Sequence, residues 1–155
     1  MRRWLRLAAP ALLIGTGLVA LTLVMGTTVN GASRWLVLGP IQLQPTELIK
    51  PFVVLQGAML FSHWRRLGLE QRVLWLAIFA GLILLILKQP NLSTAALTGL
   101  LLWLTALASG LPLHWLVGTA GLGLSAGTVS ILVNTYQRMR VTSFLDPWPV
   151  SYTHL

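Results

Sequence analysis

No Asp, Glu, Lys or Arg occurs between Lys88 and Arg138. An uncharged stretch of that length accommodates two bilayer crossings of about 20 residues each. The whole chain has 155 residues, of which 55% are hydrophobic and 9% are charged, whereas soluble domains typically carry roughly 25% charged residues. The sequence therefore predicts an integral membrane protein.

Five apolar segments predict transmembrane helices, because a lone lipid-facing strand could not satisfy its backbone hydrogen bonds. The alternating pattern of a transmembrane barrel is absent. The predicted fold class is an all-α, polytopic helical bundle. Its spans cover residues 7–25, 48–64, 73–87, 92–109 and 111–133. Residues 27–47 and 88–93 are then predicted to be loops, and a tail follows from residue 134.

Clusters of arginine predict the orientation in the membrane, since cytoplasmic loops carry an excess of Lys and Arg. The two clusters precede the first span and follow the second; they are Arg2, Arg3 and Arg6, and Arg65, Arg66 and Arg72. Both are predicted to be cytoplasmic, which places the N-terminus inside and the C-terminal tail outside. Five cations then fall on or near the external side, against the usual bias: Arg34, Lys50, Lys88, Arg138 and Arg140. This departure favours a function on the external face, such as holding an anion.

The charge balance indicates the chemistry of the partners. The net charge of +8 arises from 11 Lys and Arg against 3 acidic residues, which favours membrane lipid headgroups or a phosphorylated or pyrophosphorylated ligand. Nucleic acid is disfavoured, because the cations are scattered among membrane spans. The absence of Cys excludes disulfides and thiolate metal sites, and His63 and His114 have no partner at metal-ligand spacing. No metal site and no cofactor are predicted from these residues.

The segment QPTELIK places two ionisable side chains at the start of the second span. Pro45 suits the first turn of a helix, and Glu47 favours its positive end. Lys50 follows three residues later and shares a face with Glu47. A helix cap with a local ion pair explains the pattern structurally, but charges at a membrane entrance are also functional candidates. Pro51 predicts a kink that frees the carbonyl of Glu47.

Two other polar segments have both a structural and a functional interpretation. In NGASRW, Arg34 and Trp35 either anchor the chain at the membrane interface, or Arg34 binds a phosphate while Trp35 stacks on a sugar or isoprenoid. In KQPNLST, Asn91 predicts a helix N-cap, and Lys88 adds a cation there that favours a phosphate contact. Gly123 and Gly127 in the fifth span have the spacing of close helix packing.

The segments NGASRW, QPTELIK, KQPNLSTAAL and YQRMRVTSFLDPW resemble, in order and membrane context, the FtsW/RodA/SpoVE family of shape, elongation, division and sporulation proteins. The resemblance covers Ser33 to Trp148 and is closer to the cell-division branch than to the RodA branch. It implies a bacterial inner-membrane glycosyltransferase that polymerises peptidoglycan from lipid II with a class B penicillin-binding transpeptidase and other division proteins. It also implies about ten transmembrane helices, of which this chain resembles the third to the seventh.

The resemblance also assigns roles by position. Arg34 and Trp35 match an external-loop pair, Glu47 and Lys50 match a motif lining the central cavity, and the opening of a long external loop is matched by Arg138, Arg140 and Asp146. Fixed cations would stabilise the undecaprenyl pyrophosphate leaving group, and a carboxylate would deprotonate the acceptor hydroxyl. Lys88, Asn91 and Asp146 are secondary candidates, and the resemblance leaves room for a divalent cation.

Departures from the family pattern limit what the chain is expected to do alone. The usual QPDLGT reads QPNLST, with Asn91 for Asp and Ser93 for Gly. Residues 149–155 do not continue the pattern, so we expect a partial transmembrane domain over 1–148 followed by a truncated or non-native tail, with Met1 an internal start. The family's proposed catalytic Asp would lie beyond that tail. No catalytic residue is therefore assigned in the chain, and Asp146 is not put in its place.

Two other functions are compatible with the same residues. A transporter of lipid-linked precursors would use the same cavity and cations. A noncatalytic scaffold of the division machinery would instead use Gly123 and Gly127 to pack against partner helices.

Overall fold

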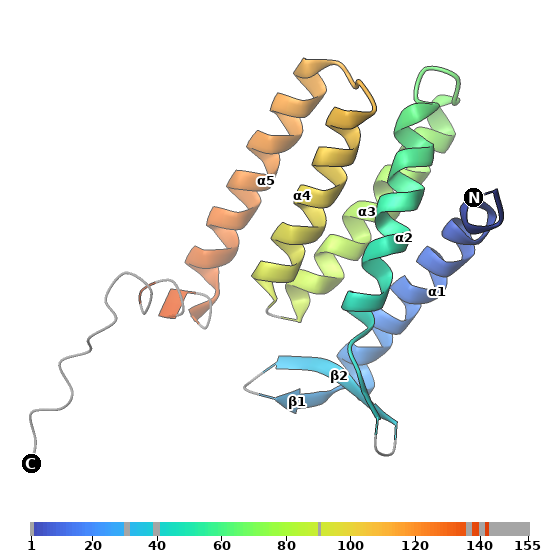
Figure 1. Cartoon of the computed structure of the whole chain (residues 1–155). Coiled ribbons are helices and arrows are strands. Elements are labelled where there is room, and N and C mark those ends of the chain that lie inside the picture. The colour runs from blue at the N-terminus through green and yellow to red at the C-terminus, as the bar shows by residue number, and fades with distance from the viewer. Residues whose placement is uncertain are drawn as a thin grey trace, which may run out of the picture.

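Five helices form a bundle that carries a small sheet at one end (Figure 1). The computed structural model describes residues 2–29, 32–38, 41–89, 91–135, 138–139 and 142. The helices are α1 (Arg2–Met25), α2 (Pro45–Ser62), α3 (Leu69–Lys88), α4 (Leu92–Ala108) and α5 (Leu113–Val133). Each predicted span falls on one of them. Within the described residues, Leu7–Met25, α3 and α5 are long and apolar enough to cross a membrane, whereas α2 and α4 are shorter, at 18 and 17 residues.

The bundle has two chemically different ends. At the sheet end, α1, α3 and α5 finish while α2 and α4 begin, and the strands lie beside them (Figure 1). The loop end carries the α2–α3 loop (residues 63–68), the α4–α5 turn (residues 109–112) and the start of α1. The two arginine clusters of the sequence therefore lie at the same end of the bundle, as the charge pattern predicts.

Local signals fix the helix ends where the sequence places them. Pro45 occupies the first turn of α2, and the Asn91 side chain caps α4 by accepting from the Thr94 amide at 3.3 Å. Gly110 ends α4 with a φ of 73°, while the amide of Leu111 donates to the carbonyl of Ala106 at 3.2 Å. A left-handed residue after the helix with this bond is a Schellman turn, which reverses the chain into α5.

The segment predicted to be a loop over residues 27–47 instead forms three short antiparallel strands. They are β1 (Thr27–Val29), β2 (Ala32–Leu38) and β3 (Ile41–Leu43), in the order β1-β2-β3. Their β-branched and apolar residues suit a sheet, but two of the strands have only three residues, too few for a periodic signal. Residues 45–47 belong to the first turn of α2 rather than to this segment.

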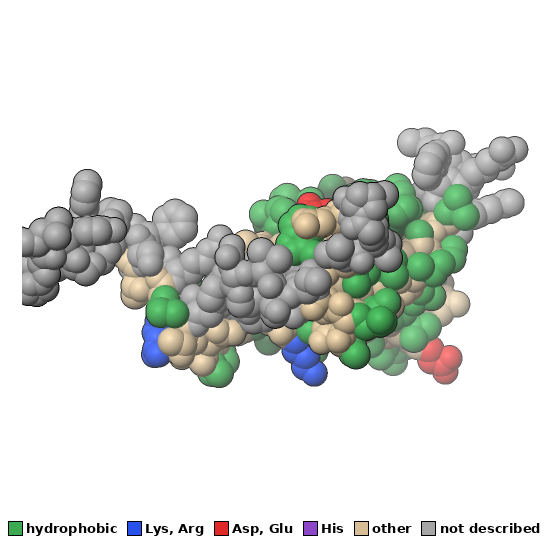
Figure 2. All heavy atoms as spheres, turned by 90° about the horizontal axis from the view of Figure 1, so that it is seen from below, with side chains coloured by type: hydrophobic (Ala, Val, Ile, Leu, Met, Phe, Trp, Pro, Cys, Tyr) green, Lys and Arg blue, Asp and Glu red, His purple; other side chains and the backbone are tan. Residues whose placement is uncertain are grey.

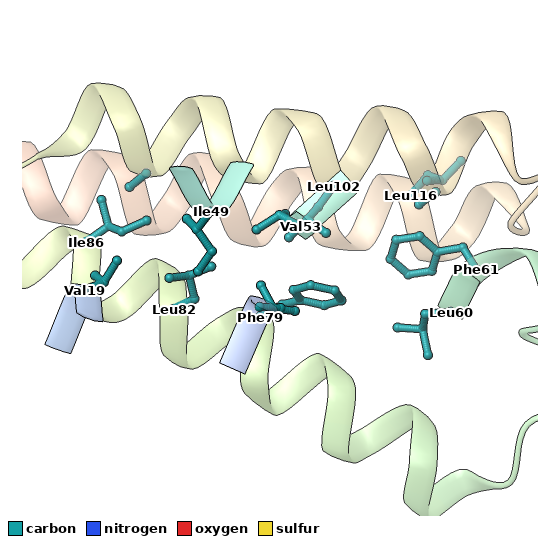
Figure 3. Packing of buried hydrophobic residues seen from close by; sticks show 13 residues of the cluster. Val19, Ile49, Val53, Leu60, Phe61, Phe79, Leu82, Ile86, Leu102 and Leu116 are labelled. Atoms are coloured by element: carbon teal, nitrogen blue, oxygen red, sulfur yellow. The ribbon is translucent and has the colours of Figure 1, made fainter. Parts of the chain in front are cut away.

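Helix α2 is the centre of the bundle, because it contacts α1, α3, α4 and β2. The buried core draws on all five helices, as Figure 3 shows. Its members are Leu12, Val19, Ile49, Val53, Leu60, Phe61, Phe79, Leu82, Ile86, Ala95, Leu102, Ala106 and Leu116. Helix α5 is the most exposed, with only Leu116 buried. Broad apolar exposure on the outer faces is what a lipid environment permits.

Two glycines allow α2 to approach its neighbours closely. A Cβ built on Gly15 of α1 would lie 2.9 Å from Cγ1 of Ile49, and one on Gly57 would lie 3.1 Å from Cδ2 of Leu102 in α4. Small residues at such crossings allow the dispersion contacts that hold helices together in lipid. Gly123 and Gly127 face open space in the described part of the chain, so their predicted packing is not made within it.

We expect Gly15→Ala to destabilise the α1–α2 contact by about 1–3 kcal/mol, because the new methyl group overlaps Ile49. Gly17→Ala is the matched control, since a Cβ there meets nothing within 4 Å, and it should be neutral or slightly stabilising through helix propensity. Thermal unfolding in detergent measures both. Equal midpoints for the two variants would contradict the close approach at Gly15.

Candidate functional site

An ion pair stands at the start of α2, at the sheet end. The Lys50 ammonium donates to both carboxylate oxygens of Glu47, at 2.7 and 2.8 Å. The Lys50 side chain is only 17% exposed, whereas that of Glu47 is 53% exposed. The predicted pairing on one helix face is therefore formed, and the cation is the more sheltered partner. A fixed ammonium beside a helix N-terminus is suited to an anionic ligand.

The residues between and beside the pair hold it in place. Ile49 is fully buried in the core, and Thr46 is 1% exposed. The hydroxyl oxygen of Thr46 is buried without a hydrogen-bond partner among the described residues. Such a group normally finds a partner in protein or water. The helix runs unbroken through Pro51, which is exposed, and the kink there stays a prediction.

Two buried amide side chains, Gln89 and Asn91, lie where α3 ends and α4 begins. Gln89 is 1% exposed and donates through Nε2 to the carbonyl of Val19 at 3.0 Å and to the hydroxyl of Thr22. Asn91, which is 4% exposed, caps α4. Asn91 satisfies an amide that the start of α4 would otherwise leave unpaired, whereas Gln89 connects the end of α3 to α1. Asn91 thus has its structural role, with its oxygen occupied by the Thr94 amide.

Arg34 lies in β2 at an irregularity of the sheet. Thr27 of β1 aligns with Trp35, and Thr28 aligns with Ser33. Arg34 therefore has no aligned residue in β1. A β-bulge of this kind is frequent next to functional sites. Strand β2 contacts both α1 and α2, which brings its backbone to the helix that carries Lys50. The side chain of Arg34 lies outside the described part, and Trp35 is partly buried.

Among the described residues, neither Lys88 nor Arg138 forms a hydrogen bond or ion pair with Glu47 or Lys50. Lys88 ends α3 and lines a groove of about 640 Å³ with residues of α1 and α3 but none of α2. Arg138 is exposed in a short turn after α5. Arg140 and Asp146 lie outside the described residues. Figure 2 views the sheet end, where the visible blue atoms of Lys and Arg form separate groups.

Sequence reasoning did not single out two buried polar residues at this end of the bundle. Gln89 and Thr46 are adjacent to residues that it singled out, but neither is charged. The available signal was a polar side chain within an apolar run, since membrane-buried polar groups need partners. Among the described residues, no three His, Asp or Glu side chains come together as a metal ion would require.

The chain belongs to the FtsW/RodA/SpoVE family of cell cycle proteins, whose pattern matches residues 1–153. Its apolar helices and this membership make it a multi-pass membrane protein. Among curated relatives, a probable peptidoglycan glycosyltransferase FtsW of Synechocystis sp. is 56% identical over 124 residues, which are 80% of this chain and 32% of the relative. The corresponding protein of Aliivibrio salmonicida is 36% identical over 96% of this chain and 38% of its own length. The chain thus spans about a third of these relatives.

Two solved structures have a similar fold. The rod shape determining protein RodA of Thermus thermophilus aligns with a TM-score of 0.67 and 35% identity over 79% of this chain and 42% of that one. A chain of a peptidoglycan synthase complex aligns with a TM-score of 0.71 and 35% identity over 96% of this chain and 45% of that one. The helical arrangement is therefore that of the family, and by sequence the chain is nearest to FtsW proteins.

We expect Gln89→Ala to lower the free energy of unfolding by about 1–2 kcal/mol, because it removes two interhelical hydrogen bonds. Gln71→Ala on the exposed surface of α3 is the control and should change stability by less than about 0.5 kcal/mol. Unfolding midpoints in detergent compare the two. Indistinguishable midpoints would show that the hydrogen bonds of Gln89 contribute nothing to the stability of the fold.

Proposed function

We propose that this chain forms part of a peptidoglycan glycosyltransferase of bacterial cell division, and that Lys50 contacts the pyrophosphate of its lipid-linked substrate. The Glu47–Lys50 pair, in which Lys50 is the sheltered partner, is the observation that carries the proposal. The named activity of the FtsW relatives supports it. We infer that the substrate is lipid II and that Arg34, Arg138 and Arg140 complete the anion-binding surface.

The role proposed for Lys50 is electrostatic. As the bond to the sugar breaks, negative charge develops on the pyrophosphate leaving group, and a cation already in position stabilises it without reorganising. Glu47 holds that cation with two short hydrogen bonds. The positive end of the α2 dipole acts in the same direction. Glu47 is therefore a positioning residue for Lys50.

The base that deprotonates the acceptor hydroxyl is proposed to come from outside these 155 residues. Glu47 is instead assigned to Lys50, which donates to both of its carboxylate oxygens. A general base must lie within hydrogen-bond reach of the proton that it removes. The chain alone is accordingly expected not to polymerise lipid II.

We further propose that the protein lies in the bacterial inner membrane with the sheet end outside and works with a class B penicillin-binding transpeptidase. The arginines of the loop end support this orientation through the positive-inside bias. Similarity to a chain of a peptidoglycan synthase complex supports such a partner.

Polymerisation of lipid II tests the proposed role of the pair. Residues 1–148 would replace the matching segment of the Synechocystis relative, and the purified chimera would be assayed with its transpeptidase partner. We expect Lys50→Ala to reduce the rate by roughly 100- to 1,000-fold, the usual loss when one preorganised electrostatic group is removed. Glu47→Ala should reduce it less, because the ammonium remains but loses its fixed position.

Two controls separate this effect from misfolding. Glu70→Ala removes an exposed acid at the start of α3, at the loop end, and should leave the rate unchanged. Lys50→Arg keeps the charge and should recover part of the activity. Full rates in both Lys50→Ala and Glu47→Ala would refute the proposed role, and polymer made by the 155 residues alone would refute the external base. Lipid II flipping without polymerisation would favour the transporter instead.

The orientation has an independent test, because the chain has no Cys of its own. Gln42→Cys in β3 and Arg65→Cys in the α2–α3 loop each introduce one exposed thiol. A membrane-impermeant maleimide added to intact spheroplasts should label the first and not the second. Labelling of Arg65→Cys alone would reverse the proposed orientation.

A further inference from the structure

A cluster of aromatic and cationic side chains joins three helices at the loop end. The rings of Phe61 and Trp64 are 6.0 Å apart, and Trp64 meets the edge of Trp115 from α5 at 6.4 Å. The guanidinium of Arg72 lies 5.2 Å from the centre of the Trp64 ring. We call these four residues, Phe61, Trp64, Arg72 and Trp115, the loop-end platform. The proposed function makes no use of it.

Hydrogen bonds hold the α2–α3 loop against this platform. The backbone amides of Arg66 and Leu67 donate to the carbonyl of His63 at 2.8 and 3.1 Å. Arg72 donates through Nε to the carbonyl of Leu67 at 3.0 Å, which closes the loop onto α3. Arg65 and Arg66 are exposed, and their side chains make no hydrogen bond or ion pair to any other described residue. Two exposed cations thus lie in a hydrogen-bonded turn, and a third, Arg72, is bonded to that turn through the carbonyl of Leu67.

Apolar side chains continue from the platform along α3. Leu69, Val73 and Leu76 follow the spacing of one helix face and are 75%, 55% and 40% exposed. Trp115 is itself half exposed, as is usual for an aromatic residue at a membrane interface. The surface therefore changes, over a few turns, from three guanidinium groups to an apolar strip that can only face lipid or another helix.

We propose that this surface binds one anionic glycerophospholipid. Arg65, Arg66 and Arg72 contact its phosphodiester headgroup, and an acyl chain lies along Leu69, Val73 and Leu76. Guanidinium groups suit phosphate oxygens because they donate in a planar fork. Charge complementarity selects an anionic over a zwitterionic lipid, and the adjoining apolar strip selects a lipid over a soluble phosphate. Glu70, exposed on the same turn of α3, weakens the site and leaves the net charge positive.

Native mass spectrometry of the chimera described above tests this proposal by counting bound lipids during titration with short-chain phosphatidylglycerol or phosphatidylcholine. Removing one cation near an anionic lipid weakens binding by about fivefold. We therefore expect Arg65→Gln with Arg66→Gln to weaken phosphatidylglycerol binding roughly 25-fold and to leave phosphatidylcholine binding unchanged. Arg65→Lys with Arg66→Lys should retain most of the affinity and shows that the loop still folds. Glu70→Gln should strengthen binding.

Lys88→Gln is the matched control, because it removes one exposed cation from the other end of the same helix. It should change the measured affinity by less than about twofold if the site is local, since exposed charges farther apart than a Debye length of about 8 Å are screened. Equal affinity of the unmodified chimera for the two lipids would overturn the proposal. So would an unchanged affinity in the double Gln variant, or equal competition by glycerol phosphate or an acidic peptide.

Discussion

The distance between α2 and its neighbours is the constraint on which the rest of the bundle depends. In lipid there is no hydrophobic gain from bringing two helices together, so contact at short range must supply the stability. Gly15 and Gly57 allow that contact on two sides of α2, against Ile49 and Leu102. Helix α2 contributes more residues to the buried core than any other helix, namely Ile49, Val53, Leu60 and Phe61. Helix α5, which lacks such a crossing, is largely exposed.

Polar groups are concentrated where the helices end. The sheet end shelters an ammonium, two amides and a hydroxyl, and the loop end carries the exposed Arg65 and Arg66 and, over the Trp64 ring, Arg72. This division follows from the cost of leaving backbone or side-chain polar groups unpaired within lipid. In both proposals the ligand group is a phosphate, which contacts a sheltered ammonium at the sheet end and guanidinium groups at the loop end.

The parts of the fold that sequence predicted are those set by neighbouring residues. The apolar spans, the Asn91 cap, the helix start at Pro45 and the pairing of Glu47 with Lys50 all depend on residues within one or two turns. The strands were missed because β1 and β3 are too short to show a period. The role of Gln89 was missed because its partners, Val19 and Thr22, lie about 70 residues earlier in the chain. Likewise, spacing marked Gly123 and Gly127 for packing, but only the tertiary structure shows which glycines meet a neighbour.

Ile49 has a position that connects packing to chemistry. It lies in the sequence between Glu47 and Lys50, and its side chain is the one that fits over Gly15. A slide or rotation of α1 along α2 must therefore displace Ile49, and with it the short stretch of backbone from which both charged side chains project. The distance between α1 and α2 therefore sets the direction in which the Lys50 ammonium points. A displacement of α1 would move that ammonium without any direct contact to Lys50.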